Sequence, residues 1–185
     1  AAGGDFCDCS EESLQKIAAY LAKNGVTAFC PTTMTLGEEA LTSILSLGDR
    51  LADTLPGARM LGFHLEGPFI ALSKKGAQNP AYVRPGTSAE FDRLNDASGG
   101  RVKIITMAPE AFDSRDFITH VCTWAHVSVG HTAASYEEAA AAYRQGADRA
   151  THLFNAMTPL QHRAPGVVGA ALANDRVFCE LICAG

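Results

Sequence analysis

Three residues of the kinds that bind transition metals stand where apolar runs of the sequence end. Glu66 follows the run in "MLGFHLEG", His131 closes "HVSVGH", and His152 lies within "ATHLF". Two neutral imidazoles and one carboxylate form a three-ligand set for a divalent metal, with one position left open. A metal in such a set can lower the pKa of water towards roughly 7 and polarise a carbonyl group. The pattern therefore indicates a catalytic metal site suited to hydrolysis.

Each of these residues taken alone is more often a hydrogen-bonded structural residue than a ligand, and it is their equivalent placement that favours a metal. His64 is in phase with Glu66 and could be a further ligand, but we expect it instead to orient a ligand or pack beside the site. Arg163 offers a fork of donors for a phosphate or carboxylate, although a surface arginine without a fixed partner has the same spacing. Gln78 could hydrogen-bond a polar substrate or simply cap a turn.

The elements that must position these side chains alternate along the whole chain. Helices are expected over 10–25, 37–57, 88–96 and 135–146, a helix or turn over 113–119, and loops over 71–87 and 155–172. Six strands are expected between them, in "VTAFCPT", "MLGFHLEG", "VKIITMAPE", "HVSVGH", "ATHLF" and "VFCELICAG". Such alternation predicts a parallel sheet with outer helices. Polar strand ends and the lack of a Gly-rich phosphate motif favour a barrel over a doubly wound sheet.

Composition narrows the class of protein further. The chain has 185 residues, 47% of them hydrophobic and 19% charged, with a net charge of −5. The length is enough for a single domain with its own core. The negative net charge argues against nucleic acid or a membrane surface as a partner. No basic segment leads into an apolar signal core, so a cytoplasmic location is expected. The six cysteines lack zinc-site spacing and are expected to be free thiols.

Longer motifs carry a resemblance to a known family. "GFHLEGPFI", "KKGAQNP", the run from "SVGHTAASYEEAAAAYRQGADRATHLFNAM" to "PGVVGAAL", and the opening "AAGGDF" together resemble the N-acetylglucosamine-6-phosphate deacetylases of the metal-dependent amidohydrolase superfamily. The resemblance implies a (β/α)8 barrel that releases acetate from N-acetyl-D-glucosamine 6-phosphate. It also implies roles for individual residues: Glu66, His131 and His152 as metal ligands, and Ala77, Asn155, Ala156 and Arg163 in contact with substrate, Arg163 near the phosphate.

The resemblance further implies one or two divalent ions, which could be Zn, Fe, Mn, Co or Ni. Gln78 stands where some members carry a histidine that polarises the carbonyl. A neutral amide can still donate a hydrogen bond there, so Gln78 is a possible oxyanion donor. Family members commonly form dimers, and a homodimer is expected as one possibility.

The departures from the family set a limit on this expectation. The family's first metal-binding segment would precede Ala1, the aspartate used as general acid/base would lie beyond Gly185, and Ala184 stands where an aspartate is usual. We therefore expect residues 1–185 to form one partial barrel domain of about six of the eight strands, without the family's small β domain. No catalytic acid/base is expected within the chain, which should be nearly inactive alone and should expose two sheet edges.

Two alternatives stay open at this point. The first is a deacetylase for another N-acetylated amino sugar phosphate, such as the galactosamine epimer, because the residues that read the epimeric hydroxyl need not lie in this chain. The second is a barrel-derived binding module that retains the pocket without catalysis.

Overall fold

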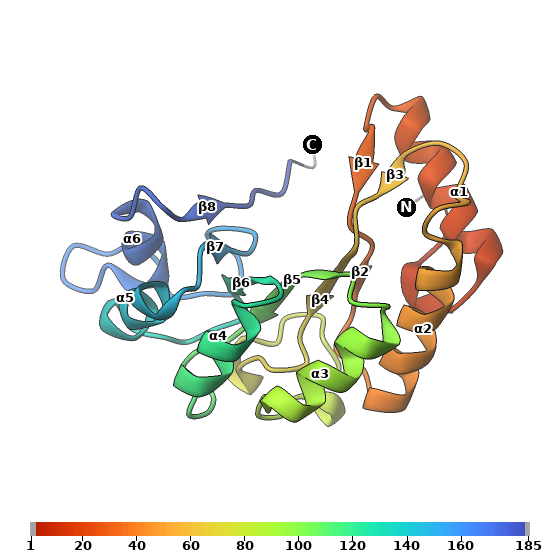
Figure 1. The fold of residues 1–185 in the computed structure, drawn as a ribbon. Coiled ribbons are helices and arrows are strands. Elements are labelled where there is room, and N and C mark those ends of the chain that lie inside the picture. The colour runs from red at the N-terminus through yellow and green to blue at the C-terminus, as the bar shows by residue number, and fades with distance from the viewer. Residues whose placement is uncertain (1–2, 184–185) are drawn as a thin grey trace.

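The computed structural model describes residues 3–183 and shows an arc of parallel strands with helices along its outer side (Figure 1). Ala184 lies outside the described residues. Neighbouring strands of the six-stranded sheet follow one another along the chain, and every pairing is parallel. The strands of this sheet are β2 (Thr32–Thr33), β4 (Phe63–Glu66), β5 (Val102–Met107), β6 (His126–Val129), β7 (Arg149–Ala150) and β8 (Phe178–Cys179).

A further parallel pair extends the first two strand segments, because β1 (Ala28–Phe29) precedes β2 and β3 (Arg59–Met60) precedes β4. The helices are α1 (Glu11–Lys23), α2 (Glu38–Leu51), α3 (Ser88–Ala97), α4 (Arg115–Val121), α5 (Tyr136–Gln145) and α6 (Gly166–Leu172). Short 3₁₀ turns are η1 (Phe6–Asp8), η2 (Leu72–Lys74) and η3 (Pro80–Tyr82). A strand followed by a helix is thus the repeating unit, as the alternation predicts.

Local sequence signals account for the beginnings of several helices. The Ser10 hydroxyl accepts a hydrogen bond from the backbone N–H of Ser13, which caps α1. Ser135 and Glu138 form a capping box at the start of α5. The apolar faces of the helices join those of the strands in one core, and this burial supplies most of the stability of such short helices.

The two faces of the sheet differ in polarity, because successive side chains of a strand point to opposite sides. One set is apolar and belongs to the core under the helices: Phe63, Leu65, Ile105, Met107, Val127 and Val129. The alternate set is polar and faces the inside of the arc: His64, Glu66, Thr106 and Ser128. Residues of this second set are hydrogen-bonded across strands, which satisfies their buried polar atoms.

The arc confirms the predicted fold class, a partial (β/α)8 barrel with six parallel strands. β2 and β8 are the edges of the six-stranded sheet in the described part of the chain. The expected loop over 155–172 is wrong in its second half, where α6 forms. Gly and Pro residues suggested a loop, but Pro165 stands at the position before the helix, where proline is tolerated. Val167 and Val168 are fully buried, so packing against α5 stabilises α6.

Two smaller expectations can be compared with the structure. Within residues 3–183, no helix is both long and apolar enough to cross a membrane. All six cysteines are free, as their spacing predicts.

Gly130 provides a test of how tightly the inner face is packed. A Cβ atom at this position would lie 2.7 Å from the Cβ of Thr151 and 2.9 Å from the Cγ2 of Thr106. We expect Gly130→Ala to lower the free energy of unfolding by about 2 kcal/mol, because overpacking forces buried side chains apart. Gly37→Ala is the control, since its Cβ would meet only the Tyr82 ring at 3.5 Å. If urea unfolding shows the same decrease in the free energy of unfolding for both variants, the proposed packing is contradicted.

Candidate metal centre

Three strand ends bring Glu66, His131 and His152 together. Glu66 is the last residue of β4, His131 follows β6 by two residues, and His152 follows β7 by two residues. Because the strands are parallel and in register, their carboxyl ends lie along the same edge of the sheet. One ligand atom from each residue lies within 4.8 Å of the other two. The structure therefore assembles the three residues that the sequence singles out.

The contacts among these three side chains are short. Nε2 of His131 lies 2.8 Å from Oε1 of Glu66, and Nε2 of His152 lies 3.1 Å from Nε2 of His131. Nε2 of His152 is also 3.6 Å from the same Glu66 oxygen. The two rings meet edge to face, with centroids 4.8 Å apart. The polar atoms of all three residues thus point at one small volume.

The hydrogen bond on the far side of His131 fixes which of its nitrogens carries the proton. Nδ1 of His131 lies 2.8 Å from the carbonyl oxygen of Lys74, and a carbonyl oxygen can only accept. Nδ1 is therefore the protonated nitrogen, and in the neutral ring Nε2 presents a lone pair to Glu66 and His152. Lone pairs that face each other need a positive charge between them, either as protons or as a cation. The donor set fits a divalent transition metal held by two imidazoles and a carboxylate.

The electrostatics of the cluster favour a bound cation. Burial alone raises the pKa of Glu66, but its close contacts with the imidazoles of His131 and His152 outweigh burial and hold the pKa well below its ordinary value. The carboxylate is therefore ionised at neutral pH. The nearby Glu66 carboxylate raises the pKa of His152, although burial lowers it, so the same negative charge acts on the second imidazole.

The backbone at the two histidines is held in an unusual conformation. His131 has φ 47° and His152 has φ 33°, both in the left-handed region that glycine prefers. Such a conformation costs a non-glycine residue about 1 kcal/mol. The backbone N–H of Ala71 donates to the carbonyl of His131 at 2.9 Å, so neighbouring loops help to hold this geometry.

His64 lies beneath the cluster and belongs to a buried hydrogen-bond chain. Its Nε2 is 2.7 Å from Oγ1 of Thr106, which is 2.7 Å from Oγ1 of Thr151, which in turn is 2.6 Å from Oγ of Ser128. Burial lowers the pKa of His64 to about 4, so its imidazole is neutral at pH 7. These hydrogen bonds connect β4, β5 and β6 to Thr151, the residue before His152. The threonines and the serine were missed at the sequence level, although their alternation with buried apolar residues was a usable signal.

Gln78 is buried against the cluster. Its amide oxygen accepts a hydrogen bond from the backbone N–H of Thr35 at 2.7 Å, and its Nε2 lies 3.3 Å from Oε1 of Glu66. The first contact fixes the orientation of the amide, so the nitrogen is directed at the site. Ala77 precedes it and is exposed.

The other residues singled out for substrate contact lie in the loop after His152. The Asn155 side chain donates to the carbonyl of His152 at 3.2 Å and is exposed. Ala156 has φ 51°, and its carbonyl accepts from the N–H of Thr132 at 3.0 Å. Arg163 is exposed and lines a separate hollow of about 330 Å³ near the start of α5, so the contacts of the described residues do not join it to the three-residue cluster.

The arc of parallel strands and the donor set at its carboxyl edge are those of a metal-dependent amidohydrolase barrel. No protein-family model matches the chain. The N-acetylglucosamine-6-phosphate deacetylase of Bacillus subtilis (strain 168) is 37% identical over 188 residues, which cover 99% of this chain and 48% of that protein. The chain is thus similar to N-acetylglucosamine-6-phosphate deacetylases along nearly its whole length.

Two further comparisons extend this result. The N-acetylgalactosamine-6-phosphate deacetylase of Escherichia coli O157:H7 is 37% identical over 186 residues, covering 100% of this chain and 49% of that protein. A Mycobacterium smegmatis N-acetyl-D-glucosamine-6-phosphate deacetylase variant, solved with N-acetyl-D-glucosamine-6-phosphate, superposes with a TM-score of 0.92 at 32% identity. That alignment covers 98% of this chain and 47% of the other. The chain thus spans about half the length of the relatives that it matches.

The charge of Glu66 should decide whether the cluster binds a cation. Glu66→Gln keeps the shape of the side chain but removes its charge, so we expect affinity for Zn²⁺ or Co²⁺ to fall at least about 100-fold. Competition with a chromophoric chelator measures this affinity in the 185-residue chain. Glu39→Gln, at an exposed position of α2, is the control and should leave the affinity unchanged. Equal affinity in the wild type and Glu66→Gln would show that Glu66 is not a ligand.

Proposed function

We propose that the protein hydrolyses the acetamide of N-acetyl-D-glucosamine 6-phosphate, adding water across the carbon–nitrogen bond to give glucosamine 6-phosphate and acetate. The observation that carries this proposal is the convergence of Glu66, His131 and His152 at the carboxyl edge of the sheet. The similarity to deacetylases along 99% of the chain supplies the reaction class. The solved Mycobacterium smegmatis complex supports a sugar phosphate as the ligand.

The three clustered residues would hold a divalent cation. When bound, such an ion supplies positive charge that polarises a carbonyl group. Zn, Fe, Mn, Co and Ni all suit imidazole and carboxylate ligands, so the proposal covers each of them and either one or two ions. Ionised Glu66 contributes the charge that retains the cation, and the hydrogen bond to the Lys74 carbonyl keeps Nε2 of His131 free to bind it.

Gln78 is proposed to donate to the substrate carbonyl. An amide nitrogen has two N–H groups, and its described contact uses one of them on Glu66. Because the N–H of Thr35 fixes the amide oxygen, the second N–H is held in place before substrate binds. A donor held in this way stabilises the negative charge that develops on the carbonyl oxygen.

Substrate contacts are proposed for Ala77, Asn155, Ala156 and Arg163. Ala77 adjoins Gln78, and Asn155 and Ala156 follow His152 by three and four residues, so these three positions are near the cluster along the chain. Arg163 is exposed and offers two parallel N–H donors to a phosphate. Its place in a hollow apart from the cluster supports a role at the phosphate end of the ligand rather than at the acetamide end.

The galactosamine epimer is a second candidate substrate. The relative that acts on it by name is 37% identical, the same value as for the Bacillus glucosamine enzyme. Identity therefore does not separate the epimers. We place the glucosamine substrate first because the other curated relatives compared carry that name.

The setting of the protein is also part of the proposal. We infer a cytoplasmic location, because six free cysteines suit a reducing compartment. The homodimer remains a prediction that sedimentation analysis would test.

Acetate release provides the direct test of the function. We expect the protein that contains this chain to release acetate from N-acetyl-D-glucosamine 6-phosphate, with a higher kcat/KM than for N-acetyl-D-galactosamine 6-phosphate. The unphosphorylated sugar is the control and should react poorly because Arg163 has no phosphate to bind. A higher kcat/KM for the galactosamine epimer would favour the second candidate, and no release from either would refute the proposal.

Replacement of Gln78 should separate its role in catalysis from its role in packing. Gln78→Met fills similar volume without a donor, and we expect kcat to fall about 100-fold, as for loss of an oxyanion donor. Gln78→His restores a donor and should recover most of the activity. If both variants lose kcat equally while KM stays constant, the side chain acts through packing and the donor role is wrong.

A further inference from the structure

Glu110 lies in the loop after β5, apart from the three clustered residues and from the proposed substrate contacts. Its carboxylate contacts the segment that directly follows His131. Oε2 accepts a hydrogen bond from the Thr132 hydroxyl, and Oε1 accepts one from the backbone N–H of Ala133. Both oxygens of a single side chain therefore hold the two residues that come after a proposed metal ligand.

Thr132 extends this contact into the neighbouring loops. It is fully buried, and its Oγ1 accepts a hydrogen bond from the N–H of Ala134 at 3.0 Å. Its own N–H donates to the carbonyl of Ala156 at 3.0 Å, in the loop that carries His152. Glu110 therefore connects three consecutive strand ends through one buried threonine.

His131 needs such support because of its backbone. Its φ of 47° is unfavourable for a side chain with a Cβ, so the conformation persists only where surrounding contacts determine it. On the preceding side, the N–H of Gly130 donates to the carbonyl of Met107 at 3.1 Å. On the following side, the charged acceptor is Glu110, and hydrogen bonds to a carboxylate are roughly twice as strong as neutral ones.

We propose that Glu110 is a positioning residue for His131: by holding Thr132 and Ala133, it keeps Nε2 of His131 aimed at Glu66 and His152. This inference rests on the proposed function, since it concerns the affinity of the cluster for a metal ion. Glu110 acts through the backbone and needs no contact with the metal or the substrate.

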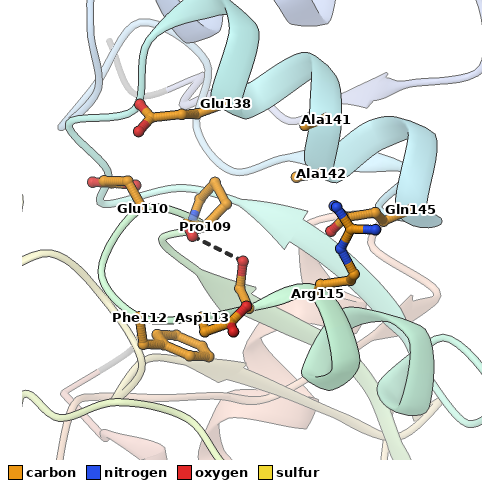
Figure 2. A pocket seen from close by; sticks show the side chains of 10 residues that line it. Pro109, Glu110, Phe112, Asp113, Arg115, Glu138, Ala141, Ala142 and Gln145 are labelled. Carbon is orange, nitrogen blue, oxygen red and sulfur yellow. Dashed lines mark hydrogen bonds between the residues drawn. The ribbon is translucent and has the colours of Figure 1, made fainter.

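The chain offers a matched control in Glu138, on α5. Glu138 also accepts a backbone hydrogen bond, from the N–H of Ser135 at 2.7 Å, but it caps a helix and does not contact residues 131–133 by any described hydrogen bond. Figure 2 shows both carboxylates at the rim of the hollow of about 320 Å³ between the loop after β5 and α5. Loss of either side chain removes a carboxylate from the same rim, while only the loss of Glu110 frees the segment after His131.

The test measures metal binding and backbone protection in the 185-residue chain. Wild type, Glu110→Ala and Glu138→Ala are titrated with Co²⁺ against a chromophoric chelator, and the visible bands of bound Co²⁺ report the ligand geometry. We expect Glu110→Ala to bind about 10- to 100-fold more weakly, as for other outer supports of metal ligands, with shifted bands. Glu138→Ala should keep the affinity and spectrum of the wild type. In the metal-free chain, hydrogen exchange of the segment 132–134 should be faster in Glu110→Ala alone.

A second pair of variants distinguishes loss of the Glu110–Thr132 hydrogen bond from a general loss of folding. Thr132→Ser keeps the hydroxyl that donates to Glu110 and should bind Co²⁺ like the wild type, whereas Thr132→Val removes it and should weaken binding. In the double variant Glu110→Ala/Thr132→Val, the fold-loss in Co²⁺ affinity should be smaller than the product of the two single fold-losses. Both substitutions remove the same hydrogen bond, so their effects are not independent.

The outcomes separate the inference from the proposed function. If the wild type binds Co²⁺ and Glu110→Ala binds it equally well with the same spectrum, the inference is overturned and the metal centre stands. If Glu110→Ala and Glu138→Ala weaken binding alike, Glu110 has only a general stabilising role. If the wild type binds no metal, the proposed metal centre fails and the inference fails with it.

Discussion

The rest of this structure depends on one constraint: the Glu66 carboxylate and the His131 and His152 imidazoles direct electron-rich atoms at the same small volume. A carboxylate oxygen and two imidazole nitrogens lie within 3.6 Å of one another in a partly buried place, and lone pairs at such distances repel unless positive charge lies between them. The parallel strand register creates this arrangement, because it brings side chains from three separate strands to the same edge. A small shift of any one strand would remove a ligand, so the packing beneath the site has a direct bearing on its chemistry.

The inner face of the arc meets this demand with hydrogen bonds rather than with hydrophobic packing. His64, Thr106, Thr151 and Ser128 form a continuous buried chain with every step at 2.7 Å or less. Hydrogen bonds have directional preferences that dispersion contacts lack, so a buried polar chain restricts strand register more sharply than apolar side chains of equal volume. The outer face remains apolar and supplies the burial that stabilises the fold.

Much of this arrangement could be read from the sequence, and the reasons for the exceptions are physical. The six strands and the clustering of Glu66 with His131 and His152 follow from local periodicity and from the geometry of parallel sheets. The helix α6 was missed because tertiary burial of its valines overrides a loop-like composition. The link from Glu110 to Thr132 was missed for another reason, since it joins loops after different strands and no local pattern records such a contact.

The left-handed backbone around the site has a consequence for the way this protein can change. His131, His152, Phe154 and Ala156 all adopt positive φ values, and each would be relieved of strain by glycine. The two histidines at these positions are candidates for metal ligation, so the residues that best suit the backbone cannot perform the chemistry. A laboratory selection for thermal stability alone would therefore tend to replace these two histidines with glycine. In stabilised variants of this chain, the first check should be whether both histidines are retained.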